Sequence, residues 1–246
     1  MTPPGPILSL VIPAFNEERL LPTCIRRIRE ACDSCREIAG RYEIIVCDNN
    51  STDRTSALAE ELGCRVVFEK ENHISRARNR GANVAGAAWL LFIDADSWPP
   101  RELIQDVAKI FLSPDYIGCG STIRIVDGPW WFKRAWESKN LSMRLLKWCP
   151  GGFILCRRDA FDEIGGFPLD HYIFEEAVFV RRLKALASVR RQKFTVLHRH
   201  PFNASGRKGT EYGFWSWTKT ALRLWWSPRT LVRDKSFARK WYDSGR

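Results

Sequence analysis

Short apolar runs alternate with amphipathic segments through the first half of the chain. The runs are rich in β-branched and aromatic residues, which favour strands over Leu8–Ile12, Tyr42–Cys47, Arg65–Phe68 and Trp89–Ile93. Between the runs, apolar residues recur at helical spacing, which predicts helices over Leu21–Cys32, Ala57–Leu62, Ser75–Ala87 and from Pro99 through Ile110. This alternation predicts an α/β fold with a mainly parallel central sheet flanked by helices and joined by right-handed crossovers.

The second half is expected to continue the same domain. Its pattern predicts a strand within Gly151–Arg158, a helix from Glu175 through Arg182 and a strand over Phe194–Leu197. A chain of 246 residues is long enough for one large α/β domain with a sizeable core. We therefore predict a single domain over residues 1–246.

Three polar loops follow strands of the predicted sheet, at Pro13–Glu17, Asp48–Asp53 and Asp94–Asp96. Each loop alone also suits a turn or a helix cap, because Asn and Asp favour both positions. In a parallel sheet, however, ligands bind beyond the carboxyl ends of the strands, so all three loops are expected at one site. Two carboxylates delivered together after a fully apolar strand are suited to holding a divalent cation.

The net charge and the Trp content of the chain indicate what kind of partner it binds. A formal net charge of +11 and 11 Trp residues indicate an anionic partner and an aromatic-rich surface; nucleic acid, phosphorylated substrates and anionic lipid all fit. Trp and basic residues gather in two regions, which suits peripheral contact with a membrane interface, although packing on the sheet or dimer formation explains them equally. The regions are Pro129–Trp136 with Leu145–Trp148, and Phe214–Trp217 with Leu222–Trp226.

Other features exclude some classes of protein. No run of about 18 uncharged apolar residues is present, and the first residues lack the pattern of a signal peptide, so we expect a protein of the cytoplasm or of the inner face of the membrane. The eight Cys residues are expected to be reduced, and several lie in core segments. Cys32 and Cys35 form a C-x-x-C without a second pair at zinc-site spacing, which favours a core role.

Six motifs, in order, resemble those of the inverting family 2 glycosyltransferases of GT-A fold, over about residues 7–200. The motifs are Val11–Glu17, Val46–Asp53, Ala77–Gly81, Phe92–Asp96, Gly165–Phe167 and Glu175-Glu176. The resemblance implies a nucleotide-sugar-binding half at about 7–120, an acceptor half at about 121–200 and a basic, Trp-rich C-terminal region at about 201–246. It also implies an enzyme that moves a sugar from a UDP- or GDP-sugar to a hydroxyl of a glycan, a lipid-linked acceptor or a small molecule.

The resemblance gives the donor loops separate roles. It implies that Asp48 accepts hydrogen bonds from the nucleotide base. Arg78 and Arg80 are expected to close over the nucleotide, by stacking or by pairing with phosphate, unless one of them is a solvated helix residue. The loop expected to border the nucleotide contains Pro13, Ala14, Phe15 and Glu17.

By the same resemblance, Asp94-Ala95-Asp96 is a D-x-D motif that binds Mg²⁺ or Mn²⁺. Asp96 is expected to ligate the metal directly, and Asp94 to contact the ribose or the metal through water. His198 is a candidate further ligand, with His200 or neither as the alternatives. A histidine beside a strand end is also commonly a surface or packed residue.

On the acceptor side, the resemblance assigns Glu176 as the general base and Glu175 as its companion. The family commonly has Asp where this chain has Glu176, and acids in the first turn of a helix are also favoured by its dipole. Gly152 and Gly166 are expected to contact the donor sugar and the acceptor, with tight turns as the alternative. Arg207, in the basic segment Ser205–Lys208, is expected to cover the diphosphate unless that segment is a generic exposed loop.

Rival functions of other classes leave different signatures. A nucleic-acid-binding protein would gather its charges on one face or tail, whereas here they are dispersed and no such motif occurs, so we expect no nucleic acid partner. A sugar nucleotidyltransferase usually has a Gly-rich, basic loop after its first strand, and Pro13–Glu17 has neither Gly nor a cation. A non-catalytic, basic membrane-binding relative and any oligomeric state stay open.

Overall fold

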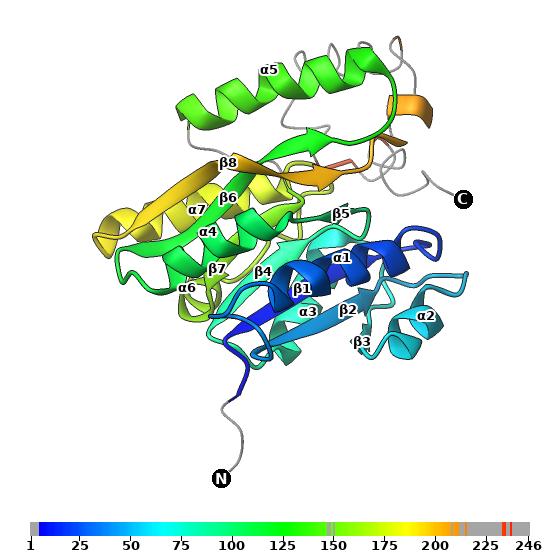
Figure 1. Cartoon of the computed structure of the whole chain (residues 1–246), viewed down its shortest axis with the longest axis horizontal. Coiled ribbons are helices and arrows are strands. Elements are labelled where there is room, and N and C mark those ends of the chain that lie inside the picture. Colours follow the sequence, from blue (N-terminus) through cyan, green and yellow to red (C-terminus); the bar gives the residue numbers. More distant parts are fainter. Residues whose placement is uncertain are drawn as a thin grey trace.

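The strands of the computed structural model form one sheet in its described part, which comprises residues 5–146, 149, 151–207, 209–211, 215, 233–234 and 237 (Figure 1). The strand order in this sheet is β3-β2-β1-β4-β7-β6-β8-β5. The strands are β1 (Leu8–Ala14), β2 (Tyr42–Asp48), β3 (Arg65–Phe68), β4 (Trp89–Ile93), β5 (Ser97–Trp98), β6 (Tyr116–Ile125), β7 (Phe153–Arg157) and β8 (Lys193–Ala204).

The helices lie between these strands in sequence and cover the two faces of the sheet. They are α1 (Leu21–Asp33), α2 (Thr55–Glu61), α3 (Ile74–Val84), α4 (Arg101–Phe111), α5 (Trp130–Leu146), α6 (Arg158–Glu163) and α7 (Glu175–Val189). In the core, α1 and α4 contribute to one face, and α3, α6 and α7 to the other. Helix α5 runs along β6 (Figure 1), and its Phe132 and Met143 belong to the two core clusters.

The pairing of the strands confirms a mainly parallel sheet. β1, β2, β3 and β4 are mutually parallel neighbours, and β6 runs parallel to β8. Strand β7 is antiparallel to both β4 and β6, and so joins the two parallel groups. The carboxyl ends of β1, β2 and β4 therefore open at the same edge, as the sequence predicted for the three polar loops.

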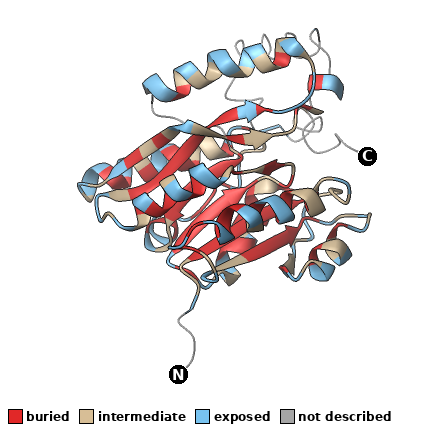
Figure 2. Ribbon diagram, in the orientation of Figure 1, coloured by how far each residue is buried: buried red, intermediate tan, exposed pale blue. Residues whose placement is uncertain are grey.

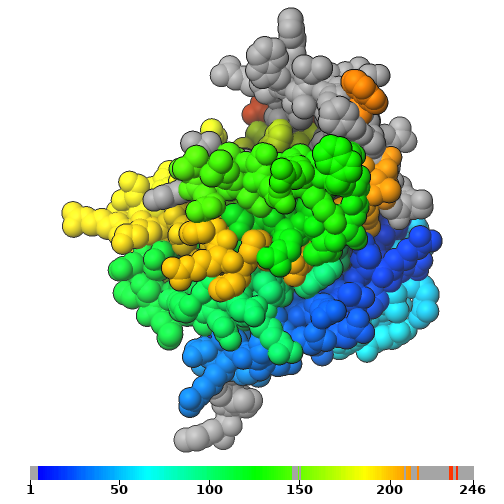
Figure 3. Space-filling model, turned by 45° about the horizontal axis from the view of Figure 1, so that its top comes forward, coloured from blue at the N-terminus to red at the C-terminus, as the bar shows by residue number. Residues whose placement is uncertain are grey.

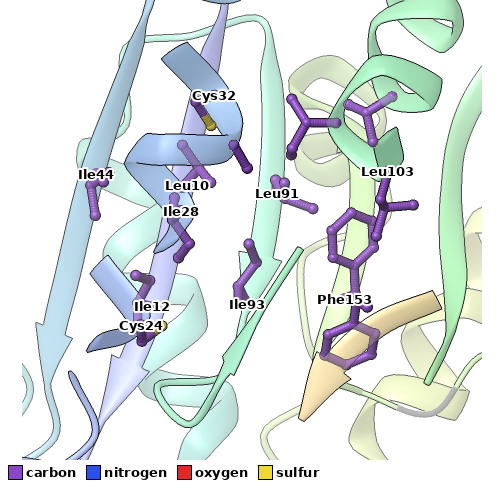
Figure 4. Close-up of a cluster of buried hydrophobic side chains, with 14 of the residues drawn as sticks. Leu10, Ile12, Cys24, Ile28, Cys32, Ile44, Leu91, Ile93, Leu103 and Phe153 are labelled. Atoms are coloured by element: carbon purple, nitrogen blue, oxygen red, sulfur yellow. The ribbon is translucent and has the colours of Figure 1, made fainter. Parts of the chain in front are cut away.

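Alternation along the central strands places apolar side chains on both faces of the sheet. In β4, Leu91 and Ile93 pack into one core cluster while Leu90 and Phe92 pack into the other, so this strand is apolar at every position. Figure 2 shows the buried sheet between partly exposed helices. Figure 4 shows the first cluster, in which α1 and α4 cover β1 and β4.

Several boundaries differ from the sequence prediction, most of them by one or two residues, and three of the differences have a clear structural reason. β1 continues through Pro13, which lies beyond Val11, the last position at which β1 pairs with β4. The missing N–H of Pro13 therefore breaks no hydrogen bond between β1 and β4. Helix α3 ends at Val84 rather than Ala87, since Ala85 is extended. β8 does not stop at Leu197: its register with β6 jumps, and residues 198–201 bulge beside Thr122.

All eight Cys residues are free and buried, which confirms that they belong to the core. No helix among the described residues is long and apolar enough to cross a membrane. Of the predicted Trp-rich regions, Trp148 and most of residues 212–232 lie outside the described residues, as does Lys208.

Candidate active site

The loops after β1 and β2 bind each other directly. The Asn16 Oδ1 atom accepts a hydrogen bond from the Thr52 amide at 2.8 Å, and the Asn16 amide donates to Ser51 Oγ at 3.0 Å. Asn16 has a φ of 53°, a left-handed conformation that Asn tolerates better than most residues. These bonds hold Phe15 and Glu17 beside the loop that follows Asp48.

Asp48 and Asn49 continue the same edge of the sheet, and both are buried. Asp48 Oδ1 accepts a hydrogen bond from the Ser51 amide at 2.9 Å, so part of its bonding capacity shapes its own turn. The Asn49 side chain bonds the backbone of Glu71 and of His73, and so fixes the start of α3. The sequence pattern predicts no role for Asn49, although this residue lies inside the motif Val46–Asp53.

Arg78 is the central cation of the site and is only 2% exposed. Its Nη1 atom donates to Glu175 Oε1 at 2.8 Å, and its Nη2 atom donates to Asp94 Oδ1 at 3.0 Å. The guanidinium also lies over the Phe167 ring, 5.1 Å from its centre. Burial lowers the pKa of Arg78, but the charges of Asp94, Glu175 and Glu176 raise it by more, so the guanidinium stays charged. Arg78 thus pairs with carboxylates instead of pointing to solvent.

The two acids at the start of α7 are in different states. Burial and then the neighbouring Glu176 charge raise the pKa of Glu175, which is 4% exposed. Burial also opposes ionisation of Glu176, but the Arg78 charge, a hydrogen bond from Glu175 and the Gly151 amide at 3.0 Å together lower its pKa. Burial therefore favours the neutral form of Glu175, whereas the groups around Glu176 favour its ionised form.

The two pKa shifts make the folding stability depend on pH in opposite directions. The lowered pKa of Glu176 contributes stability above its ordinary value of 4.5, and this contribution is lost as the pH falls through the folded-state pKa. The raised pKa of Glu175 acts in the opposite sense: its contribution is present below its ordinary value and is lost as the pH rises through the folded-state pKa.

Glycines leave room between these charged groups. A Cβ atom on Gly151 would lie 3.0 Å from Arg78 Nη2 and 3.2 Å from Glu176 Cδ. Gly152 has a φ of 105°, and a Cβ there would lie 3.3 Å from Asp94 Oδ2 and 2.8 Å from Phe202. The structure therefore places Gly152 against the D-x-D motif.

Asn79 holds the backbone of Phe167, the residue whose ring lies beneath Arg78. Its side-chain amide donates to the Phe167 carbonyl and accepts from the Phe167 amide, both at 2.9 Å. Gly166 has a φ of 68°, and a Cβ atom there would lie 2.7 Å from Asn79 Oδ1, so this turn requires glycine. Since Phe167 lies beneath Arg78, Asn79 positions the central cation indirectly. The sequence assigned Asn79 no role, because its partner is a backbone segment 88 residues away.

Arg207 closes the other side of the D-x-D motif. Both of its terminal nitrogens pair with the Glu17 carboxylate, one of them at 3.0 Å, and Nη2 lies 3.6 Å from Asp96 Oδ2. Asp127 accepts hydrogen bonds from Ser205 and from the Gly206 amide, which anchors the segment before Arg207. The predicted Arg207 segment is thus held against the loops after β1 and β4.

Three candidate residues lie apart from this cluster. Arg80 is exposed on α3. His198 is exposed in the β8 bulge, with its Nδ1 atom 3.4 Å from the Val196 carbonyl oxygen. His200 pairs with Asp106 of α4 at 3.0 Å. In the part of the chain that the structure describes, no three His, Cys, Asp or Glu residues are grouped so as to hold a metal ion.

The two acids of the D-x-D motif nevertheless suit a hard cation. Asp96 is 13% exposed and Asp94 is 33% exposed, so both carboxylates keep some contact with solvent. The space beside Asp94 Oδ2 is the space that a side chain at residue 152 would fill. Mg²⁺ binds through one or two carboxylates and takes its other oxygens from substrate phosphates and water, so two protein ligands suffice.

A sequence model described as "Glycosyl transferase family 2" matches residues 9–176. The match covers more than half of the chain and ends at Glu176, and so includes each of the six motifs. The chain belongs to this family.

Two curated relatives match shorter segments. A PGL/p-HBAD biosynthesis glycosyltransferase of Mycobacterium bovis (strain BCG / Pasteur 1173P2) is 33% identical over 98 residues, which cover 37% of this chain and 36% of the relative. An undecaprenyl-phosphate 4-deoxy-4-formamido-L-arabinose transferase of Pseudomonas paraeruginosa (strain DSM 24068 / PA7) is 32% identical over 153 residues, 57% and 42% of the two chains. The chain spans about two fifths of the length of these relatives.

Solved structures confirm the GT-A fold. S. aureus TarS 1-349 in complex with UDP-GlcNAc superposes with a TM-score of 0.64 at 17% identity, covering 95% of this chain and 69% of that one. Glucosyl-3-phosphoglycerate synthase of Mycobacterium tuberculosis, in complex with Mn²⁺, UDP and glucosyl-3-phosphoglycerate, gives 0.62 at 19% identity, covering 94% and 82%. At these identities the likeness concerns the fold alone.

Replacing Arg78 tests the buried ion pairs. Arg78→Met keeps much of the side-chain volume but leaves Asp94 and Glu175 without their cation. We expect the free energy of unfolding to fall by about 3 kcal/mol, as is typical when one partner of a buried pair is removed. Arg80→Met, at an exposed position on the same helix, is the control and should change it by less than about 0.5 kcal/mol. Equal denaturant midpoints for the two variants would contradict this role of Arg78.

Proposed function

We propose that the chain is a metal-dependent, inverting glycosyltransferase that moves a sugar from a nucleoside diphosphate sugar to an acceptor hydroxyl. The observation that supports it best is the bridge made by Arg78. This single buried cation joins Asp94 of the D-x-D motif to Glu175, next to the general base Glu176. The donor side and the acceptor side therefore meet at one guanidinium.

Asp48 and the loop after β1 form the proposed nucleotide site. Their position at the carboxyl edge of the parallel strands is where α/β sheets bind ligands. The Asp48 carboxylate is held by its turn, so its remaining lone pairs can accept hydrogen bonds from a base N–H. A UDP-sugar or a GDP-sugar is the proposed donor, and one structure of similar fold, S. aureus TarS 1-349, is a complex with UDP-GlcNAc.

Asp96 and Asp94 would hold Mg²⁺ or Mn²⁺ with the donor diphosphate. When bound, such an ion neutralises the charge that builds on the diphosphate as the sugar leaves. Arg207 would add a second positive charge, because its guanidinium already lies against Asp96 and Glu17. A guanidinium can pair with phosphate oxygens through two parallel N–H bonds.

Glu176 is the proposed general base. Its lowered pKa keeps it ionised, so it can accept the proton of an acceptor hydroxyl. The acceptor oxygen then forms a bond to the anomeric carbon while the bond from that carbon to the diphosphate oxygen breaks, which inverts the configuration. Arg78 and the Gly151 amide hold Glu176 ionised and oriented.

Helix α5 supports a membrane-proximal acceptor. Its outer face exposes Trp130 by 77%, Leu141 by 57% and Leu145 by 73%, and Arg134 and Arg144 lie among them. In Figure 3 this helix lies on the surface as a band of green atoms. Exposed indole and leucine groups with interspersed cations suit the interface of an anionic bilayer. A lipid-linked acceptor would be reached from such a surface.

The two glutamates give a matched test of the chemistry. Glu176→Gln removes the base, so transfer should fall about 10²- to 10⁴-fold while the donor still binds. Glu175→Gln is the matched change at the neighbouring position: it keeps an oxygen that can accept the Arg78 hydrogen bond and a group that can donate to Glu176, so it should cost less activity than Glu176→Gln. Donor hydrolysis, transfer and the donor-induced shift in melting temperature are measured for both. Equal activity of the two variants would place the base elsewhere.

Sedimentation with liposomes tests the membrane surface. The protein should sediment with vesicles that contain anionic lipid, and less so as the salt concentration rises, because salt screens the attraction. A Trp130→Ser/Leu145→Ser variant should bind more weakly. Val189→Ser, at an apolar residue 81% exposed at the end of α7, should bind as the unaltered protein does. Absence of binding, or identical binding of both variants, would remove the proposed contact.

A further inference from the structure

Phe174, the residue before α7, has a left-handed backbone. Its φ is 61° and its ψ is 21°, and it provides no side-chain cap for the helix. A bulky residue in this region is a steric outlier, whereas glycine adopts the same conformation freely. Such residues gather at functional sites, where the surrounding structure holds them in place.

The segment around Phe174 is held from both sides. Before it, the Tyr172 ring lies 4.6 Å from the His73 ring at the start of α3, and Ile173 is 6% exposed. After it, Glu175 is 4% exposed and bound to Arg78. Phe174 itself is 40% exposed. The left-handed turn therefore leaves an aromatic ring partly open to solvent between two buried neighbours, directly before the catalytic acids.

The charges around Glu176, two residues after Phe174, distinguish between classes of acceptor. An ionised Glu176 needs an acceptor that still has a proton to give, as a sugar hydroxyl has. A phosphate acceptor is already an anion at neutral pH and would meet the Glu176 carboxylate as a like charge. Two cations interact with Glu176: Arg78, which is paired with Asp94 and Glu175, and Lys139 of α5, whose pKa is lowered by burial and only partly restored by Glu176.

We propose that Phe174 binds the acceptor and that the acceptor group at this position is a neutral sugar ring, stacked on the phenyl face with one hydroxyl directed to Glu176. This inference rests on the proposed function and names the acceptor class of the same site. The face of a phenyl ring is electron-rich, and the C–H groups of a sugar ring are polarised by their neighbouring oxygens, so the two surfaces attract each other. An aromatic platform also binds without forming a covalent or ionic link, which lets the product leave.

Saturation-transfer NMR with methyl glycosides of the common hexoses tests this inference, with UDP and Mg²⁺ present and decyl phosphate as the competing probe. The unaltered protein should bind a methyl glycoside in preference to decyl phosphate. Phe174→Ala should weaken glycoside binding about three- to tenfold, and Phe174→Tyr should preserve it. Phe174→Gly separates the backbone strain from sugar binding. This variant should melt at a higher temperature than Phe174→Ala, because glycine adopts the left-handed conformation without strain. It should bind the glycoside as weakly as Phe174→Ala does, because both variants lack the phenyl ring.

The outcomes are distinct from those that test the proposed function. A donor-induced rise in melting temperature without binding of any glycoside would overturn the acceptor inference alone. So would preferential binding of decyl phosphate, or unchanged glycoside affinity in Phe174→Ala. Absence of any donor-induced shift in the unaltered protein would contradict the proposed function, and the acceptor inference with it.

Discussion

The buried guanidinium of Arg78 is the interaction on which the rest of the site depends. It joins the loop after β4 to the start of α7, two elements far apart in the sequence. A cation taken out of water must be paired and hydrogen-bonded to persist, and here its partners are the carboxylates that the proposed chemistry needs. Asn79 holds the backbone of Phe167, whose ring lies beneath the guanidinium. Gly151 and Gly152 leave space beside Arg78 and Asp94 that a side chain would fill. The charge of Arg78 lowers the pKa of Glu176 and opposes the rise that burial causes in the pKa of Glu175.

The second constraint is the contact between the segment before Arg207 and the donor loops. Arg207 reaches Glu17 after β1 and Asp96 after β4, while Asp127 fixes the turn that precedes it. A late segment of the chain therefore completes a site built mainly by the first half. In this arrangement Arg78 pairs with Asp94 and Arg207 lies 3.6 Å from Asp96, so each acid of the D-x-D motif has its own cation.

Local patterns were enough to predict much of the fold, and less of the site. Arg65–Phe68 and Trp89–Ile93 were predicted with their observed bounds, because β-branched and apolar runs between helices have few alternatives. The D-x-D position followed from the parallel-sheet rule. By contrast, the burial of Arg78 and the role of Asn79 depend on partners 16 to 97 residues away, and a sequence does not show whether an arginine on a helix is solvated. The β8 bulge at 198–201 was missed for the same reason, since it is set by the register against β6.

The central claim is that these carboxylates and cations form one metal-dependent site for a nucleoside diphosphate sugar. A melting-temperature titration with UDP- and GDP-sugars, with and without Mn²⁺, tests it most directly, because a ligand that binds only the folded state stabilises it by about 2.7 kcal/mol at a hundred times its Kd. We expect a UDP- or GDP-sugar to raise the melting temperature when Mn²⁺ is present, and Asp96→Asn to abolish that rise. If no nucleotide sugar stabilises the protein in either condition, the claim is contradicted.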